Sequence, residues 1–255
     1  MTLEKWLNLL KKVWKLKINW NFIKPLFLLV LVGFLYSFSH RKNADKNVKN
    51  ILVEFDAGEN LFMNYEMVNK LLIQKGKTVK NERLSALDLH LLEANLLLHP
   101  MVENAALFLT VDGLLKTKVK QREPIARVIS NTDSYYIDRQ AKKMPLSLNH
   151  SARVVLVSGD INEEDNEQIH YLVEKILAND FLKKQIIGIR KMKNNEFVLD
   201  TRVGDQKIKL GIIENLNEKF MNLESFFKKA AIDKTVDNYS LINLKYDNQV
   251  VCTKK

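Results

Sequence analysis

ENAALFLTVDGLLKTKVKQ, residues 103–121, joins two runs rich in β-forming residues through the dipeptide Asp112-Gly113. A two-residue Asp-Gly link between such runs is the strongest short-range signal for a β-hairpin. The type I′ turn expected at this link needs positive φ at both residues. The stretch therefore predicts two antiparallel strands, and the sequence on either side indicates what packs against them.

The sequence before the hairpin predicts one strand and two helices. KNILVEF, residues 49–55, has the alternating pattern of a half-buried strand. Asn64 is the expected N-cap of a first helix, which Gly76 is expected to end. Ser85 and Asp88 resemble a capping box that opens the leucine-rich helix ALDLHLLEANLLL, and Pro100 closes this helix. Residues 45–122 thus form a predicted β-α-α-β-β domain.

The sequence after the hairpin, residues 123–255, predicts a mixed β-sheet domain with two helices. Asn162 with Asp165 can cap a first helix that carries one apolar stripe, and a second helix is expected at residues 217–230. The last two strands predict a hairpin that turns at Asp247-Asn248. The fold class is therefore α+β. The strand-like runs are PIARVIS, SYYID, ARVVLVSG, QIIGIRKM, EFVLDTRV, QKIKLGI, YSLINLKY and QVVCT.

FIKPLFLLVLVGFLYSFSHRK, residues 22–42, is an apolar stretch in which Lys24 is the only charge before the terminal basic pair. A helix from Trp20 to Ser39 would span about 30 Å, which matches the hydrocarbon core of a bilayer. Residues 22–39 are therefore the expected transmembrane helix. The expected membrane-anchoring residues are Trp20, Phe22, Leu26, Leu29, Val32, Leu35 and Tyr36.

A cleaved signal peptide is the alternative interpretation of this stretch. Ser37 and Ser39 have the small side chains and the spacing that a signal peptidase reads. The basic region before the apolar run is longer than a normal signal n-region, however, and it carries three tryptophans. An anchor that stays in the membrane is therefore favoured.

Residues 1–24 supply half of the formal net charge of +10, and the other half is spread over the remaining 231 residues. Residues 1–24 hold six lysines and one acidic residue, whereas four positive residues follow the stretch closely. This asymmetry places residues 1–21 in the cytoplasm as a basic tail and the later domains across the membrane. No Arg-rich helix and no zinc-finger spacing is present in the sequence, so the charge does not indicate nucleic-acid binding.

No residue pattern in the sequence predicts catalysis, a metal or a cofactor. The five histidines are scattered without a ligand spacing, and Cys252 is the only cysteine. The acidic run GDINEED, residues 159–165, opens a predicted helix, where negative charge complements the exposed amide groups. Gly-rich phosphate loops and nucleophile elbows are absent from the sequence. A protein that acts by binding is therefore expected.

The terminal run YSLINLKYDNQVV, residues 239–251, is the expected binding element. A last strand often borders its sheet and leaves amide and carbonyl groups for another chain to pair with. The alternative is that this strand only completes the fold. Tyr246 is the expected anchor for a partner, because its ring can be buried while its hydroxyl stays hydrated. The expected partner-binding residues are Tyr239, Leu241, Leu244, Tyr246, Gln249, Val250 and Val251.

Several segments, in their order along the chain, resemble the FtsQ/DivIB family of bacterial division proteins. The sharpest are HPMV at residues 99–102, REPIA at residues 122–126 and INLKYDNQVV at residues 242–251, and SYYIDRQAKKMPLS at residues 134–147 adds to them. The chain departs from the family pattern at Ala141, where the family often has Gly, and at Asn243, where the family has an acidic residue.

The resemblance implies a non-enzymatic, bitopic inner-membrane scaffold of the divisome that is enriched at the division septum. It implies that residues 45–122 are a polypeptide-transport-associated (POTRA) domain and that residues 123–255 are a β domain, both periplasmic. The terminal region would recruit FtsB, itself paired with FtsL, and the scaffold would join other septal divisome proteins for peptidoglycan synthesis. The alternatives are a POTRA-containing periplasmic export or assembly factor and a cleaved periplasmic enzyme.

Overall fold

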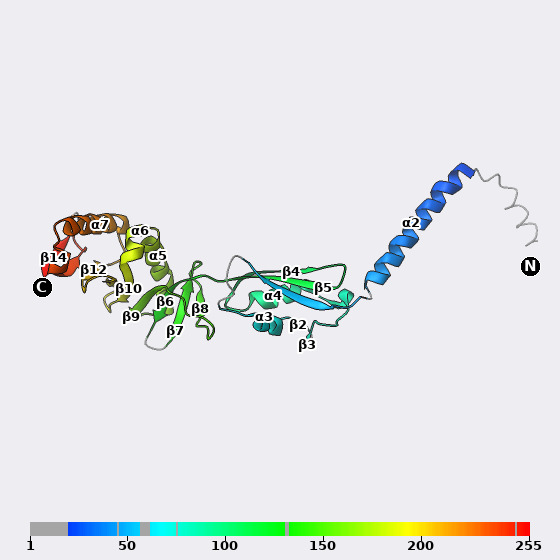
Figure 1. Cartoon of the computed structure of the whole chain (residues 1–255), viewed down its shortest axis with the longest axis horizontal. Helices are drawn as coiled ribbons and strands as arrows, with labels where there is room; N and C mark the ends of the chain where they lie inside the picture. The colour runs from blue at the N-terminus through cyan, green and yellow to red at the C-terminus, as the bar shows by residue number, and fades with distance from the viewer. Residues whose placement is uncertain (1–19, 45, 57–61, 75, 131–132, 248) are drawn as a thin grey trace, which may run out of the picture.

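The structure is a computed structural model that describes residues 20–44, 46–56, 62–74, 76–130, 133–247 and 249–255. Figure 1 shows a long N-terminal helix, a small sheet with its helices and a large sheet in succession along the longest axis. The described residues confirm the predicted α+β class, with an apolar N-terminal helix before two sheet-containing parts.

The N-terminal helix α2 (Trp20–Ala44) is long and apolar enough to cross a membrane over Ile23–Arg41. None of the side chains in this apolar segment is buried against the rest of the described chain, as expected of a helix whose solvent is lipid. The prediction of an apolar N-terminal helix is confirmed. Residues 1–19 of the expected cytoplasmic tail lie outside the described residues, as do the side chains of Trp20 and Phe22.

The small sheet has the strand order β1-β5-β4. Its central strand pairs in parallel with β1 and antiparallel with β4, so the helices between β1 and β4 carry the chain across the sheet. Val53, Leu92 and Leu115 meet in the core between the sheet and its helices. The elements are β1 (Asn50–Phe55), α3 (Tyr65–Leu71), β2 (Ile73–Gln74), β3 (Lys77–Thr78), η1 (Leu84–Ala86), α4 (Leu89–Leu97), β4 (Val102–Leu109) and β5 (Leu114–Gln121).

The helix caps in this part follow the sequence at one point and differ from it at two. The Asn64 side chain accepts a hydrogen bond from the Met67 N–H at 2.9 Å, as expected of an N-cap. The helix ends at Leu71, earlier than predicted, because Ile73–Gln74 pairs with Lys77–Thr78 and Gly76 serves that turn at φ +74°. Asp88 itself is the N-cap of α4, whereas its predicted partner Ser85 lies in η1.

The β4–β5 hairpin forms as predicted, but its turn is not type I′. The Gly113 N–H donates to the Thr110 carbonyl at 3.1 Å, and Gly113 has φ +85°, whereas Asp112 does not have a positive φ. The connection is therefore a four-residue turn with one left-handed position. Tertiary packing adds a second reason for glycine, since a Cβ there would lie 2.6 Å from the Asn47 carbonyl oxygen.

The large sheet has the strand order β14-β13-β12-β11-β10-β9-β6-β7-β8. Figure 1 shows α5, α6 and α7 on one side of it. Its strands are β6 (Pro124–Ile129), β7 (Ser134–Asp138), β8 (Lys143–Pro145), β9 (Val155–Gly159), β10 (Ile186–Lys191), β11 (Phe197–Thr201), β12 (Lys207–Gly211), β13 (Tyr239–Asn243) and β14 (Val251–Lys254). Its helices are η2 (Glu163–Asp165), α5 (Asn166–Leu177), α6 (Asp180–Gln185), α7 (Leu216–Ile232) and η3 (Val236–Asn238).

The short helix α6 was not predicted from the sequence. Six residues carry too little periodicity to be recognised, and the element depends on its cap. The Asn179 side chain accepts hydrogen bonds from the Phe181 and Leu182 N–H groups at 2.9 and 3.0 Å. By contrast, the predicted capping box of Asn162 and Asp165 is present before α5.

A row of apolar side chains crosses the large sheet on the face that the helices cover. The strand registers place these residues side by side, and all but the last are buried. Burying each large apolar side chain contributes about 1.5–3 kcal/mol, so this row is a main source of stability. The row runs Val128, Val157, Ile189, Leu199, Ile208, Ile242 and Cys252.

Candidate partner-binding site

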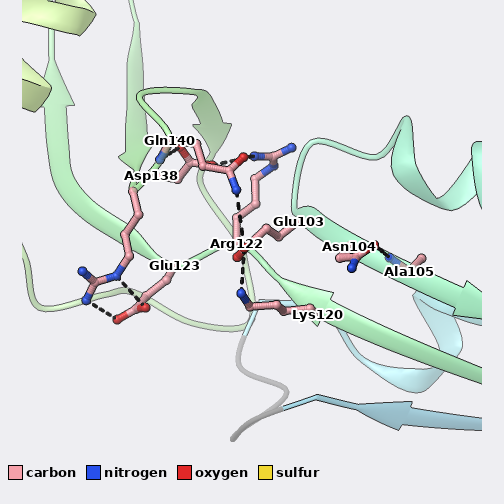
Figure 2. Close-up of polar contacts among 9 residues, drawn as sticks. Glu103, Asn104, Ala105, Lys120, Arg122, Glu123, Asp138 and Gln140 are labelled. Atoms are coloured by element: carbon pink, nitrogen blue, oxygen red, sulfur yellow. Dashed lines mark hydrogen bonds and ion pairs between the residues drawn. The ribbon is translucent and has the colours of Figure 1, made fainter.

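The junction between the two sheets is a polar cluster around Arg122, shown in Figure 2. The Arg122 Nη1 donates to Asp138 Oδ2 at 2.6 Å, and both side chains are nearly buried. The other carboxylate oxygen of Asp138 accepts the N–H groups of Gln140 and Lys142, each at 2.8 Å. One carboxylate therefore closes the β7–β8 turn and ties it to the end of the small sheet.

Two further ion pairs flank this contact. Lys120 Nζ lies 2.7 Å from Glu103 Oε1 across the small sheet, and Arg139 makes two hydrogen bonds to Glu123 at 2.8 and 3.1 Å. The hydrogen bond from Arg139 holds the pKa of Glu123 below its ordinary value. The guanidinium and the carboxylate thus stay charged at neutral pH.

Apolar contacts also cross the junction. Tyr136 and Met144, from β7 and β8, lie in the core of the small sheet, and the Tyr136 hydroxyl accepts the Ala152 N–H at 3.1 Å. The predicted division of the chain at residues 122 and 123 stays a prediction. The packing explains how the small sheet can hold the large sheet in a defined orientation.

The terminal strands lie at the other edge of the large sheet. β13, which contains Tyr239 and Leu241, pairs in parallel with β12 and antiparallel with β14. The last strand β14 therefore borders the sheet, and no strand lies on its outer side among the described residues. The predicted terminal hairpin is present, but its connection covers residues 244–250 and is not a two-residue turn at Asp247; Asn248 lies outside the described residues.

The hydrogen bonds of β14 show which of its amides point outward. The Lys255 N–H donates to the Asn238 carbonyl at 2.9 Å, toward β13. Because consecutive residues of a strand direct their N–H groups to opposite sides, the Lys254 N–H points away from the sheet. The Cys252 N–H, two residues earlier, points away from the sheet as well. These outward donors are the groups that an added strand would pair with.

The seven predicted partner-binding residues occupy three different settings. Tyr246, Gln249 and Val251 are exposed, at 52% for Tyr246 and 43% for Val251. Tyr239, Leu241 and Val250 are half-buried, and the Tyr239 ring lies 5.5 Å from that of Phe226. Leu244 is only 2% exposed and belongs to the core, so its side chain is not available to a partner. Sequence could not separate Leu244 from its neighbours, because its burial depends on packing beneath α7.

Two lysines near the terminal connection are already engaged. Lys245 forms an ion pair with Glu196, and this hydrogen bond lowers the pKa of Glu196. Lys219 Nζ donates to the carbonyls of Leu210 and Ile212 at 3.1 and 2.9 Å, and burial lowers its pKa. Burial also raises the pKa of the Cys252 thiol, which disfavours the nucleophilic thiolate. This arrangement suits binding and offers no activated nucleophile.

A groove of about 610 Å³ opens where the parallel strands β6, β9 and β10 begin. Arg153, Lys183 and Arg202 line it from three separate segments of the chain, and Ile125 with Ile187 adds apolar surface. Sequence reasoning missed this groove because its residues are far apart along the chain. No group of three potential metal ligands occurs anywhere in the part of the chain that the structure describes.

Comparison with protein-family models gives one match. A family described as "FtsQ/DivIB, C-terminal related" matches residues 123–253, which is more than half of the chain. The matched part begins one residue before β6 and includes most of β14, so it covers the large sheet. No curated protein matches the chain.

Proposed function

The chain belongs to the FtsQ/DivIB, C-terminal related family, and we propose that it recruits the FtsB/FtsL pair as a bitopic inner-membrane scaffold of the divisome. FtsQ/DivIB proteins are non-enzymatic division proteins, so the chain has a role in bacterial cell division. The scaffold would link early and late division proteins for septal peptidoglycan synthesis. The family match supports this role over that of an export or assembly factor.

The proposed arrangement has the N-terminus in the cytoplasm, α2 in the inner membrane and a POTRA-like domain followed by the β domain in the periplasm. The single apolar helix and the lysine-rich residues before it support this orientation. Alkaline phosphatase fused after Lys255 should be active, because it folds correctly only when exported. High activity of a strictly cytoplasmic reporter at the same position would refute the orientation.

The observation that carries the proposal is the open edge at β14. An incoming strand of FtsB would pair with the outward N–H groups of Cys252 and Lys254 and extend the large sheet. Main-chain hydrogen bonds would supply much of the affinity, and side chains would supply selectivity. Tyr246, Gln249 and Val251 are proposed as the direct contacts. Tyr239, Leu241 and Val250 would support them, and Leu244 would hold the connection in the core.

Substitutions at Lys254 test this edge directly. Lys254→Pro removes an outward donor and leaves the inward hydrogen bonds of β14 intact, whereas Lys254→Ala removes the charged side chain and keeps the N–H donor. Full-length protein in nanodiscs should be titrated with the extramembrane segments of FtsB and FtsL. We expect the proline to weaken binding about tenfold or more, and the alanine about threefold or less. Equal binding by both folded variants would refute β-augmentation at this edge.

Tyr246→Ala tests the proposed side-chain anchor. Truncating an aromatic anchor at an interface typically costs about 2 kcal/mol, or about 30-fold in affinity. Lys184→Ala on α6 is the matched surface control and should leave affinity unchanged. If Tyr246→Ala also binds normally while Lys254→Pro does not, the partner reads the edge of the sheet without using this ring.

A further inference from the structure

The end of the small sheet next to α2 is tied to the membrane anchor by a short connection. Helix α2 ends at Ala44 and β1 begins at Asn50, so the connection reaches at most about 20 Å when fully extended. The apolar segment itself ends at Arg41, which places the headgroup region close to this end. A contact between this end and the membrane requires only that α2 crosses a bilayer and is independent of the division role.

Hydrogen bonds reduce the freedom of this connection further. The Val48 N–H donates to the Glu82 carbonyl at 2.9 Å, and the Lys49 N–H donates to the Gly113 carbonyl at 2.8 Å. The Leu84 N–H donates to the Lys46 carbonyl at 2.8 Å. Two separate parts of the small-sheet unit, residues 82–84 and the β4–β5 turn, are thereby attached to the residues that leave the membrane. Figure 1 shows the β4–β5 turn and the neighbouring loops at the α2 end.

This end, which we call the membrane-proximal end, carries Lys46, Lys49, Lys80 and Arg83 around the tip of the β4–β5 hairpin, and Arg41 lies in the last turn of α2. Arg41, Lys49, Lys80 and Arg83 are exposed, and Lys46 is half-buried with its Nζ on the Val111 carbonyl at 2.9 Å. The acidic residues nearby in the sequence are Asp45, Glu82 and Asp112, so positive charge is in excess.

The tip of the hairpin adds an apolar contact. The Val111 side chain is 68% exposed at the turn, and the Lys46 ammonium donates a hydrogen bond to the Val111 backbone carbonyl. An exposed apolar side chain on a surface with excess positive charge is the composition that favours the interface of an anionic bilayer. Without a membrane, an exposed valine side chain at this position would not stabilise the protein.

We propose that the membrane-proximal end binds anionic phospholipid headgroups, with Lys49, Lys80 and Arg83 on the phosphates and Val111 at the interface. Each Lys or Arg close to an anionic membrane strengthens association about fivefold, and the tether keeps these side chains within that range. The contact would fix the angle of the body relative to the membrane. β14 lies at the end of the molecule farthest from α2 (Figure 1). The lipid contact would therefore hold the partner-binding edge at a defined distance from the membrane.

Fluorescence quenching in nanodiscs tests the contact with the full-length chain. Cys252→Ser removes the only cysteine, and Val111→Cys then accepts a single fluorophore. A nitroxide on the lipid headgroup should quench this label in discs that contain phosphatidylglycerol, and at least about twofold less in pure phosphatidylcholine or at high salt. A fluorophore at Leu148→Cys is the control, because Leu148 is fully exposed in the loop after β8, toward the opposite end of the small sheet.

Charge reversal separates lipid binding from mere proximity. Lys49→Glu, Lys80→Glu and Arg83→Glu together should reduce quenching at residue 111 to the phosphatidylcholine level. The matched control reverses Lys183, Lys184 and Lys193 on the large-sheet part and should leave quenching unchanged. Equal quenching in both lipids and in the triple variant would overturn the proposal, as would absence of quenching. If the triple variant fails to fold, the salt and lipid dependence of the unreversed protein decides the question.

Discussion

At one edge of the large sheet, Tyr136 of β7 and Met144 of β8 are buried, whereas at the opposite edge Val251 of β14 is 43% exposed. The first edge contributes both side chains to the core of the small sheet, and its turn holds the carboxylate that pairs with Arg122. The second edge directs the Lys254 N–H away from the sheet. One edge is thus used to join two parts of the same chain, and the other edge stays open for the proposed partner.

Removing the carboxylate of Asp138 should have the largest effect on stability. Asp138→Ala leaves a nearly buried guanidinium and two backbone amides without their acceptor, so we expect a loss of about 3–5 kcal/mol in the free energy of unfolding. At the terminal edge, Asp247→Ala should change it by about 0.5 kcal/mol or less, because Asp247 is exposed. Urea unfolding in detergent would measure both, and similar losses would remove the proposed difference between the edges.

The two edges should also differ in their response to loss of a tyrosine hydroxyl. Tyr136→Phe leaves the Ala152 N–H without its acceptor, and we expect a loss of about 1–2 kcal/mol. Tyr239→Phe should cost less than about 0.5 kcal/mol, since its contact in the described structure is between rings and not through the hydroxyl. The same unfolding measurement distinguishes these outcomes. A larger loss at Tyr239 would show that the terminal edge is the more rigid one.

A smaller gain in stability is expected at the β7–β8 turn. Ala141 has φ +60°, a left-handed conformation that costs an L-residue about 1–2 kcal/mol. Ala141→Gly should therefore stabilise the protein by about 0.5–1 kcal/mol after the greater freedom of glycine in the unfolded chain is subtracted. Ala178→Gly is the control, because Ala178 has φ −71° and glycine should destabilise it. Destabilisation at both positions would mean that the turn relaxes in solution.

The smallest effect on stability is expected when low pH protonates Glu196, the partner of Lys245 in the terminal connection. The hydrogen bond from Lys245 lowers the pKa of Glu196 below its ordinary value of 4.5. The stabilising contribution is therefore complete above pH 4.5 and is lost as the pH falls through the lowered pKa. An NMR titration of the Glu196 carboxyl should show this shift, and Lys245→Ala should reduce it, because Asn194 also lowers this pKa. An unchanged titration in that variant would show that Lys245 does not hold the terminal connection in solution.

Some elements could be predicted from the residues next to them in the sequence. The apolar run of α2, the Asn64 cap and the capping box of Asn162 and Asp165 were all predictable, because each depends on residues within a few positions of one another. Local signals failed where a neighbour from elsewhere in the chain intervened. The turn at Gly113 is shaped partly by the Asn47 carbonyl, and α3 ends early because β2 pairs with β3.

The sequence by itself determined that this is an α+β protein with an apolar N-terminal helix, a hairpin before the Arg122 segment and a strand-rich second half. Only the tertiary structure decided that β13 is interior, that β14 is the edge and that Leu244 is buried. The reason is that β13 pairs in parallel with β12, across a connection that contains the whole of α7. Such pairing brings together residues far apart in the chain, and no local pattern specifies which strands will meet.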